Sequence, residues 1–114
     1  MWEPGDVIRH VVLFRCRPEV GEAELTGIFD ELEALKDVIP GILAVSAGRD
    51  CSPEGLQAGM THGFTVDFVD VASRDRYLAH PDHRTVGARL VNAVEGGRGG
   101  LVVIDWVSTI DADR

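Results

Sequence analysis

Side chains that could move a proton are concentrated in one short segment of the chain. Tyr77, His80 and His83 lie within the seven residues Tyr77-Leu78-Ala79-His80-Pro81-Asp82-His83. An imidazole with a pKa of about 6.5 can act as a general base near neutral pH, and a phenol can donate a hydrogen bond to an oxygen that gains negative charge. The segment could therefore remove a proton alpha to a carbonyl group and stabilise the enolate, as an aldol-type or enolisation reaction requires.

The other histidines, His10 and His62, each stand within an apolar run. A histidine in that setting is often a hydrogen-bonded core residue rather than a catalyst. Alternatively, the two could meet across adjacent strands and position a ligand or a water molecule. His83 has a comparable alternative, in which its ring is a buried polar anchor satisfied by the backbone or by Tyr77.

Patterns for metals and phosphate groups are weak. His80 and His83 have helical spacing, but Pro81 interrupts the helix between them and no third ligand is evident, so no metal site is predicted. The segment Gly96–Gly100 precedes a strand and lacks a following Lys-Ser/Thr, which favours a flexible connection over a phosphate cradle.

Cys16 and Cys51 have no CxxC spacing and are expected to be reduced thiols. No cofactor is expected.

The elements that must position these residues alternate between strands and helices. Apolar and β-branched runs predict strands over residues 7–15, 42–47, 61–70 and 101–107. Apolar residues at helical spacing predict one helix that begins near Glu22 and runs to Ile39, before Pro40 and Gly41. A short helix over residues 72–79 and a second helical piece, capped by Asp82 and running to about Val94, follow the third strand.

This order predicts an α+β, ferredoxin-like β-α-β-β-α-β fold, with a four-stranded antiparallel sheet and the helices on one side. The 114 residues suffice for one domain, with a core over about residues 7–107, a short arm before it and a loose tail from Ser108. The third strand should place His62, Phe64, Val66 and Phe68 on one face.

The strands carry more apolar side chains than one face can bury. Those that cannot join the helix-covered face are Val7, Val11, Leu13, Val102, Ile104 and Trp106. The helix-free face should therefore expose more apolar area than a monomer normally does. A second copy of the chain is the simplest cover, so a homodimer through the sheet faces is expected.

Charge excludes several classes of partner. There are 19 acidic and 11 basic side chains, which give a formal net charge of −8. Nucleic acids and anionic membranes would be repelled, and no stretch approaches the roughly 18 apolar residues of a membrane helix. A cytoplasmic protein is expected by default.

Three segments together resemble the stress-responsive A/B barrel (Dabb) family of the dimeric α/β barrel superfamily. They are Ile8-Arg9-His10-Val11-Val12-Leu13-Phe14, Gly59-Met60-Thr61-His62 and the Tyr77–His83 segment, and the resemblance extends from Ile8 to Trp106. It implies a dimeric barrel with a cavity between each sheet and its own helices.

The resemblance also implies roles for individual residues. Members of the olivetolic acid cyclase type close a polyketide chain by aldol condensation without a metal or cofactor, and their catalytic tyrosine and histidine match Tyr77 and His83. Their pocket histidines match His10, His62 and His80, which are therefore expected to contact ligand. The sequence departs from the family pattern at Met60, where an aromatic residue is usual, and at Asp50, where asparagine is frequent.

Three functions follow as hypotheses. The first is a cofactor-independent cyclase, lyase or isomerase that acts on a small hydrophobic carbonyl compound through His83 and Tyr77. The alternative is a non-catalytic ligand-binding or stress-protective dimer. A haem-binding monooxygenase on the related barrel is a third, for which only His83 or His80 could be the axial ligand.

Overall fold

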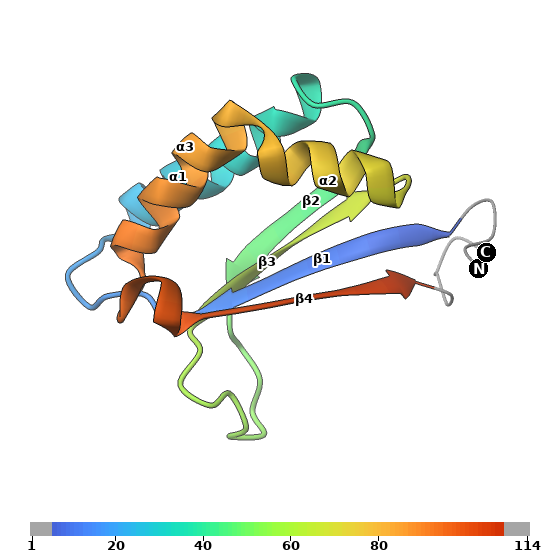
Figure 1. Ribbon diagram of the computed structural model, residues 1–114. Helices are drawn as coiled ribbons and strands as arrows, with labels where there is room; N and C mark the ends of the chain where they lie inside the picture. Colours follow the sequence, from blue (N-terminus) through green and yellow to red (C-terminus); the bar gives the residue numbers. More distant parts are fainter. Residues whose placement is uncertain (1–5, 109–114) are drawn as a thin grey trace.

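The computed structural model describes residues 6–108, and Figure 1 shows one antiparallel sheet with the helices on one side of it. The strand order is β2-β3-β1-β4, which confirms the predicted ferredoxin-like α+β fold. Most of the predicted arm and tail lies outside the described residues. The elements are β1 (Val7–Phe14), α1 (Glu22–Ala34), η1 (Leu35–Asp37), β2 (Ile42–Arg49), β3 (His62–Phe68), α2 (Val71–Ala79), α3 (Pro81–Ala93), η2 (Gly97–Gly100) and β4 (Leu101–Ser108).

The two central strands bury alternate side chains beneath the helices. In β3 the buried residues are His62, Phe64, Val66 and Phe68, as predicted, and in β1 they are Ile8, His10, Val12 and Phe14. Successive side chains of a strand point to opposite faces, so the local alternation decides which residues face the helices. The core thus lies between these strands and α1, α2 and α3.

The first helix is shorter than its apolar pattern predicts. Its first turn carries Glu22 and Glu24, which suit the positive end of the helix dipole. The regular α-helix ends at Ala34 and continues as the 3₁₀ segment η1 to Asp37, so the prediction of one helix to Ile39 is wrong in its last turn. Side chains at i and i+3 share a face in both helix types, and the apolar spacing therefore does not reveal the change.

The chain turns at Gly41 after this segment, with a φ of 94°. A Cβ atom there would lie 2.0 Å from the Ser73 Oγ of α2, so only glycine allows this approach.

Helices α2 and α3 are separated at His80, whose backbone is extended. His80 is the N-cap of α3, and its Nδ1 accepts a hydrogen bond from the Asp82 backbone N–H at 3.0 Å. The prediction that Asp82 caps this helix is therefore wrong. Pro81 is the reason, since a proline suits the first helical position and moves the cap to the residue before it.

The helix-free face of the sheet is apolar and exposed, as predicted. Its exposed members include Leu13, Val102, Ile104 and Trp106, of which Ile104 is 53% and Trp106 45% exposed. Arg9 and Asp67 lie on the same face and form a two-point ion pair, with N···O distances of 2.7 and 2.9 Å. Within residues 6–108, no helix is long and apolar enough to cross a bilayer.

Candidate active site

A cavity of about 830 Å³ lies between α3 and the sheet. Its floor includes His10, Val12 and Phe64 from the central strands, and Leu101 and Val103 from β4. Helix α3 forms the opposite wall along most of its length, from His83 to Asn92. Tyr77 closes the end at which α2 meets α3.

Tyr77 and His83 meet at this end of the cavity. Tyr77 lies in the last turn of α2 and His83 in the first turn of α3, and their ring centroids are 4.2 Å apart. The Tyr77 hydroxyl and the His83 Nδ1 atom are buried, and neither has a hydrogen-bond partner among residues 6–108. A buried polar atom without a hydrogen bond lowers the stability of the fold unless a ligand or a water molecule supplies the missing partner. Both groups are therefore suited to bind a polar group of a ligand.

Burial determines the protonation of this pair. Desolvation raises the pKa of the Tyr77 hydroxyl above its usual value, so the phenol stays protonated and can donate a hydrogen bond. Desolvation is also the main cause that lowers the pKa of His83, and the neighbouring His10 and Arg84 add to the effect. The nearby Leu78 backbone opposes the shift in part. Near neutral pH the His83 ring is therefore neutral and able to accept a proton.

His10 approaches the same pair from β1. Its ring centroid lies 5.8 Å from that of Tyr77, and its Nδ1 atom lies 2.8 Å from the Asp105 Oδ1 atom of β4. An ionised carboxylate can only accept, so Nδ1–H donates and a neutral ring keeps its lone pair on Nε2. The second Asp105 oxygen accepts from Arg74 Nη1 of α2 at 3.0 Å. The chain Arg74–Asp105–His10 therefore fixes the tautomer and orientation of the His10 ring.

His62 lies at the opposite end of the sheet. It pairs with Phe14 in the register of β1 and β3, whereas His10 pairs with Val66. The prediction that His10 and His62 meet across adjacent strands is therefore wrong: a match of two histidines to adjacent strands does not fix their register. The His62 ring stacks on Phe14, and its Nδ1 atom lies 2.7 Å from the Thr61 hydroxyl.

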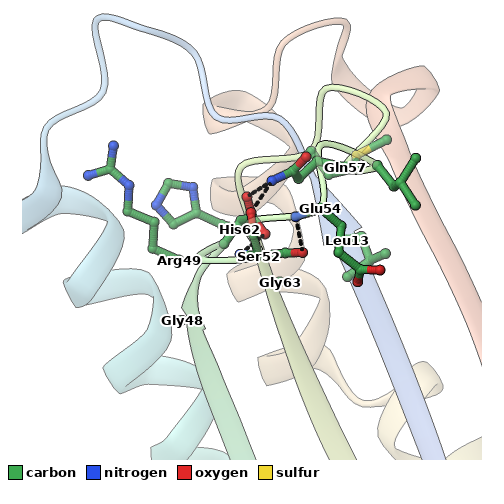
Figure 2. A pocket seen from close by; sticks show the side chains of 11 residues that line it. Leu13, Gly48, Arg49, Ser52, Glu54, Gln57, His62 and Gly63 are labelled. Carbon is green, nitrogen blue, oxygen red and sulfur yellow. Dashed lines mark hydrogen bonds between the residues drawn. The ribbon is translucent and has the colours of Figure 1, made fainter.

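A smaller pocket of about 460 Å³ lies where the β2–β3 loop passes the end of the sheet (Figure 2). Gly48, Gly63 and Leu13 line it from the strands. Within the loop, the Gln57 amide donates one hydrogen bond to the Asp50 carboxylate and one to the Ser52 backbone carbonyl. His62 also lines this pocket. Its buried Nε2 atom lies 3.8 Å from the Glu22 carboxylate of α1 and has no hydrogen-bond partner among the described residues. His62 therefore does not belong to the larger cavity.

His80 makes a structural contact rather than a cavity contact. Its Nδ1 atom is occupied by the cap of α3, and its side chain is not among those that line the larger cavity. Its expected contact with ligand stays a prediction, and so does that of His62.

The structure thus brings His10, Tyr77 and His83 together and adds two residues that the sequence analysis did not select. Asp105 and Arg74 come from β4 and α2. A signal for Asp105 existed, because it is the one charged residue in the apolar strand β4. Among the described residues, no group of three His, Cys, Asp or Glu side chains could hold a metal ion.

Comparison with known proteins agrees with this architecture. The model of the Stress responsive A/B Barrel Domain (Dabb) family matches residues 8–108. The chain belongs to this family. The Dabb match spans every strand that contributes to the cavity, from His10 in β1 to Leu101 and Val103 in β4.

Two curated relatives and one solved structure are similar to this Dabb protein. Olivetolic acid cyclase of Cannabis sativa is 28% identical over 76 residues, which cover 67% of this chain and 75% of the cyclase. A stress-response A/B barrel domain-containing protein of Arabidopsis thaliana is 26% identical over 109 residues, which cover 96% of each chain. The crystal structure of a dimeric ferredoxin-like protein of unknown function from Jannaschia sp. CCS1 superimposes with a TM-score of 0.81, at 26% identity, over 88% of this chain and 97% of that one.

Proposed function

We propose that this Dabb protein is a homodimeric, cofactor-independent enzyme that removes a proton alpha to a carbonyl group of a small hydrophobic molecule. A cyclase, lyase or isomerase reaction could follow from that step. The observation that carries the proposal is the pair of unsatisfied buried groups at the end of the cavity, the Tyr77 hydroxyl and His83 Nδ1. The similarity to olivetolic acid cyclase supports the same class of chemistry.

Each residue has its own role in this proposal. His83, neutral near pH 7, takes the proton from the carbon next to the carbonyl group. The protonated Tyr77 donates a hydrogen bond to the carbonyl oxygen as its negative charge develops. His10 lies beside Tyr77 and, held by Asp105, presents a second polar group of fixed orientation. The apolar walls exclude water and accommodate a hydrophobic substrate.

A homodimer is part of the proposal because the helix-free face needs cover. The exposed side chains of Leu13, Val102, Ile104 and Trp106 form the kind of apolar patch that marks an interface. The similar protein from Jannaschia is dimeric. A second copy that stacks its sheet on this one would bury the patch and leave the cavity, on the other side of the sheet, accessible.

The test is proton exchange at carbon in D₂O. Apolar 1,3-dicarbonyl compounds would be incubated with the protein, and loss of the alpha-proton signal would be followed by NMR. We expect catalysed exchange that His83→Ala and Tyr77→Phe each reduce at least about a hundredfold, as is typical for loss of a general acid or base. Full exchange activity in both variants would refute the proposed roles. If the unaltered protein catalyses no exchange and the two variants lose thermal stability, the result would instead favour the non-catalytic dimer.

A further inference from the structure

The cationic side chains of this acidic protein are nearly all engaged. Within residues 6–108, the only lysine or arginine side chains without a hydrogen bond or an ion pair are those of Arg84 and Arg98. The engaged ones are Arg9, Arg15, Arg17, Lys36, Arg49, Arg74, Arg76 and Arg89. Both unengaged arginines line the larger cavity. Both side chains are solvent-exposed, and in a chain of net charge −8 their common position at one cavity favours a site for negative charge there.

The two arginines mark opposite ends of the cavity. Arg84 follows His83 in the first turn of α3, whereas Arg98 lies beyond the end of α3, on the same side as Asn92. Eight residues of helix separate Arg84 from Asn92, a distance of about 12 Å at 1.5 Å per residue. Arg98 is therefore remote from the Tyr77–His83 pair.

The cavity between these ends is apolar. Val86, Leu90 and Val91 line it from α3, and Leu101 and Val103 line it from β4. Asn92 adds a side-chain amide at the Arg98 end, and this amide makes no hydrogen bond of its own. A molecule that fills the cavity would thus meet polar groups at both ends and a hydrophobic passage in the middle.

The glycine segment before β4 holds Arg98 at this place. It is not a loose connection but the 3₁₀ turn η2, entered through Gly96 and Gly97 with φ values of 84° and 60°. These conformations favour glycine, so the glycine-rich composition specifies one turn geometry. A defined turn lowers the entropy lost when a ligand immobilises the arginine.

From this arrangement we propose that the cavity binds an elongated apolar carboxylic acid, whose carboxylate is held by Arg98 and Asn92 at the end remote from His83. This inference rests on the proposed use of the cavity for a small molecule and adds the class of that molecule. A planar guanidinium group pairs well with a carboxylate through two parallel N–H···O hydrogen bonds, and the Asn92 amide supplies another donor. The carbonyl carbon that reacts would then lie near the other end of the substrate.

The experiment compares octanoate with 1-octanol, which have the same number of carbon atoms in an unbranched chain and differ in charge. Titrations of the full-length protein at pH 8, followed by isotope-edited NMR of the backbone amides, give both dissociation constants. We expect octanoate to bind about five- to tenfold more tightly than 1-octanol, a preference that falls as salt is added. Arg98→Gln should remove the preference by weakening octanoate alone. Arg89→Gln, in α3 and paired with Glu31 outside the cavity, should keep it.

Several outcomes would overturn the inference. Equal or weaker binding of octanoate by the unaltered protein would do so, as would an equal loss for both probes in Arg98→Gln. If Arg84→Gln loses the preference for octanoate and Arg98→Gln keeps it, the carboxylate binds near His83 and not at the Arg98 end. If neither probe binds, the small-molecule cavity of the proposed function fails too, whereas equal binding of both leaves it standing.

Discussion

Asp105 holds the His10 ring from the edge of the sheet. The His10 side chain is 6% exposed, and its Nδ1–H has the Asp105 carboxylate as its partner. Removal of that carboxylate would leave a buried donor unsatisfied, with Arg74 also losing a partner. Asp105 is thus a positioning residue for the proposed site.

Asp105→Ala should lower the free energy of unfolding by about 1–3 kcal/mol, the usual cost of an unsatisfied buried polar group. The matched control is Asp75→Ala, which also removes a carboxylate from Arg74 but from an exposed position. The control should change the free energy by no more than about 0.5 kcal/mol. Urea unfolding of both variants measures the difference, and equal losses would contradict the proposed support of His10.

His83 should make the stability of the protein depend on pH. Its pKa is lowered in the folded state, mainly by desolvation, so the unfolded chain binds more protons between the folded pKa and about 6.5. The free energy of unfolding therefore falls as the pH falls through this window and levels off below the folded pKa. One such group contributes at most about 1.4 kcal/mol per pH unit, and less here because the ring is partly solvent-exposed.

The measurement is urea unfolding of the unaltered protein and of His83→Gln between pH 7 and pH 5. The variant should show the shallower decline, because glutamine does not titrate. Parallel curves for the two proteins would mean that His83 titrates alike in the folded and unfolded states. Proton exchange by the unaltered protein should persist through most of this window and be lost only as the pH falls through the lowered folded-state pKa of His83, since the protonated ring cannot act as a base.

At the scale of elements, the break between α2 and α3 creates the Tyr77–His83 pair. His80 is extended between the two helices, so residues six apart in sequence bring their rings to 4.2 Å. One continuous helix would separate these residues by about 9 Å along its axis. The cap that begins α3 therefore also sets the geometry of the site.

His80 should contribute to stability through this cap. His80→Ala should lower the free energy of unfolding by about 1 kcal/mol, whereas His80→Asn should largely preserve it because asparagine is a good N-cap. Thermal or urea unfolding distinguishes the two variants. The affinity of His80→Asn for 1-octanol distinguishes the capping role of His80 from its expected contact with ligand. Unchanged affinity would argue against that contact. Weaker affinity in a variant of full stability would support it.

For the whole molecule, the apolar helix-free face leads us to expect a dimer. Trp106 is 45% exposed on this face, next to Arg9 in the register of β1 and β4. Trp106→Glu should place a charge in the interface and convert the dimer to a monomer at micromolar concentration. Burial of a carboxylate in an apolar interface is costly, and the neighbouring Arg9 already pairs with Asp67. Val38→Glu, at an exposed valine next to η1 on the helix side, is the control and should stay dimeric.

Sedimentation equilibrium reports the mass of each protein, with circular dichroism as a check that the monomer is folded. An unaltered protein that sediments as a monomer would remove the need for a second copy. A Trp106→Glu variant that stays dimeric would instead move the interface to another surface.

Local patterns in the chain were sufficient for much of the fold. The alternation in β1 and β3 and the apolar spacing of α1 determined the ferredoxin-like order, and they selected the face that buries His10 and His62. The excess of apolar residues in β1 and β4 indicated the exposed face. These features depend on the period of each element, which is a property of neighbouring residues.

Tertiary structure decided the composition of the site. The strand register placed Asp105 opposite His10 and His62 at the far end of the sheet. The two-residue period of a strand shows which residues share a face but not which residues of two strands pair. The glycine turn before β4 placed Arg98 at the cavity, next to residues of α3. Each of these contacts joins residues whose separation in space depends on how whole elements pack, so no local pattern could determine them.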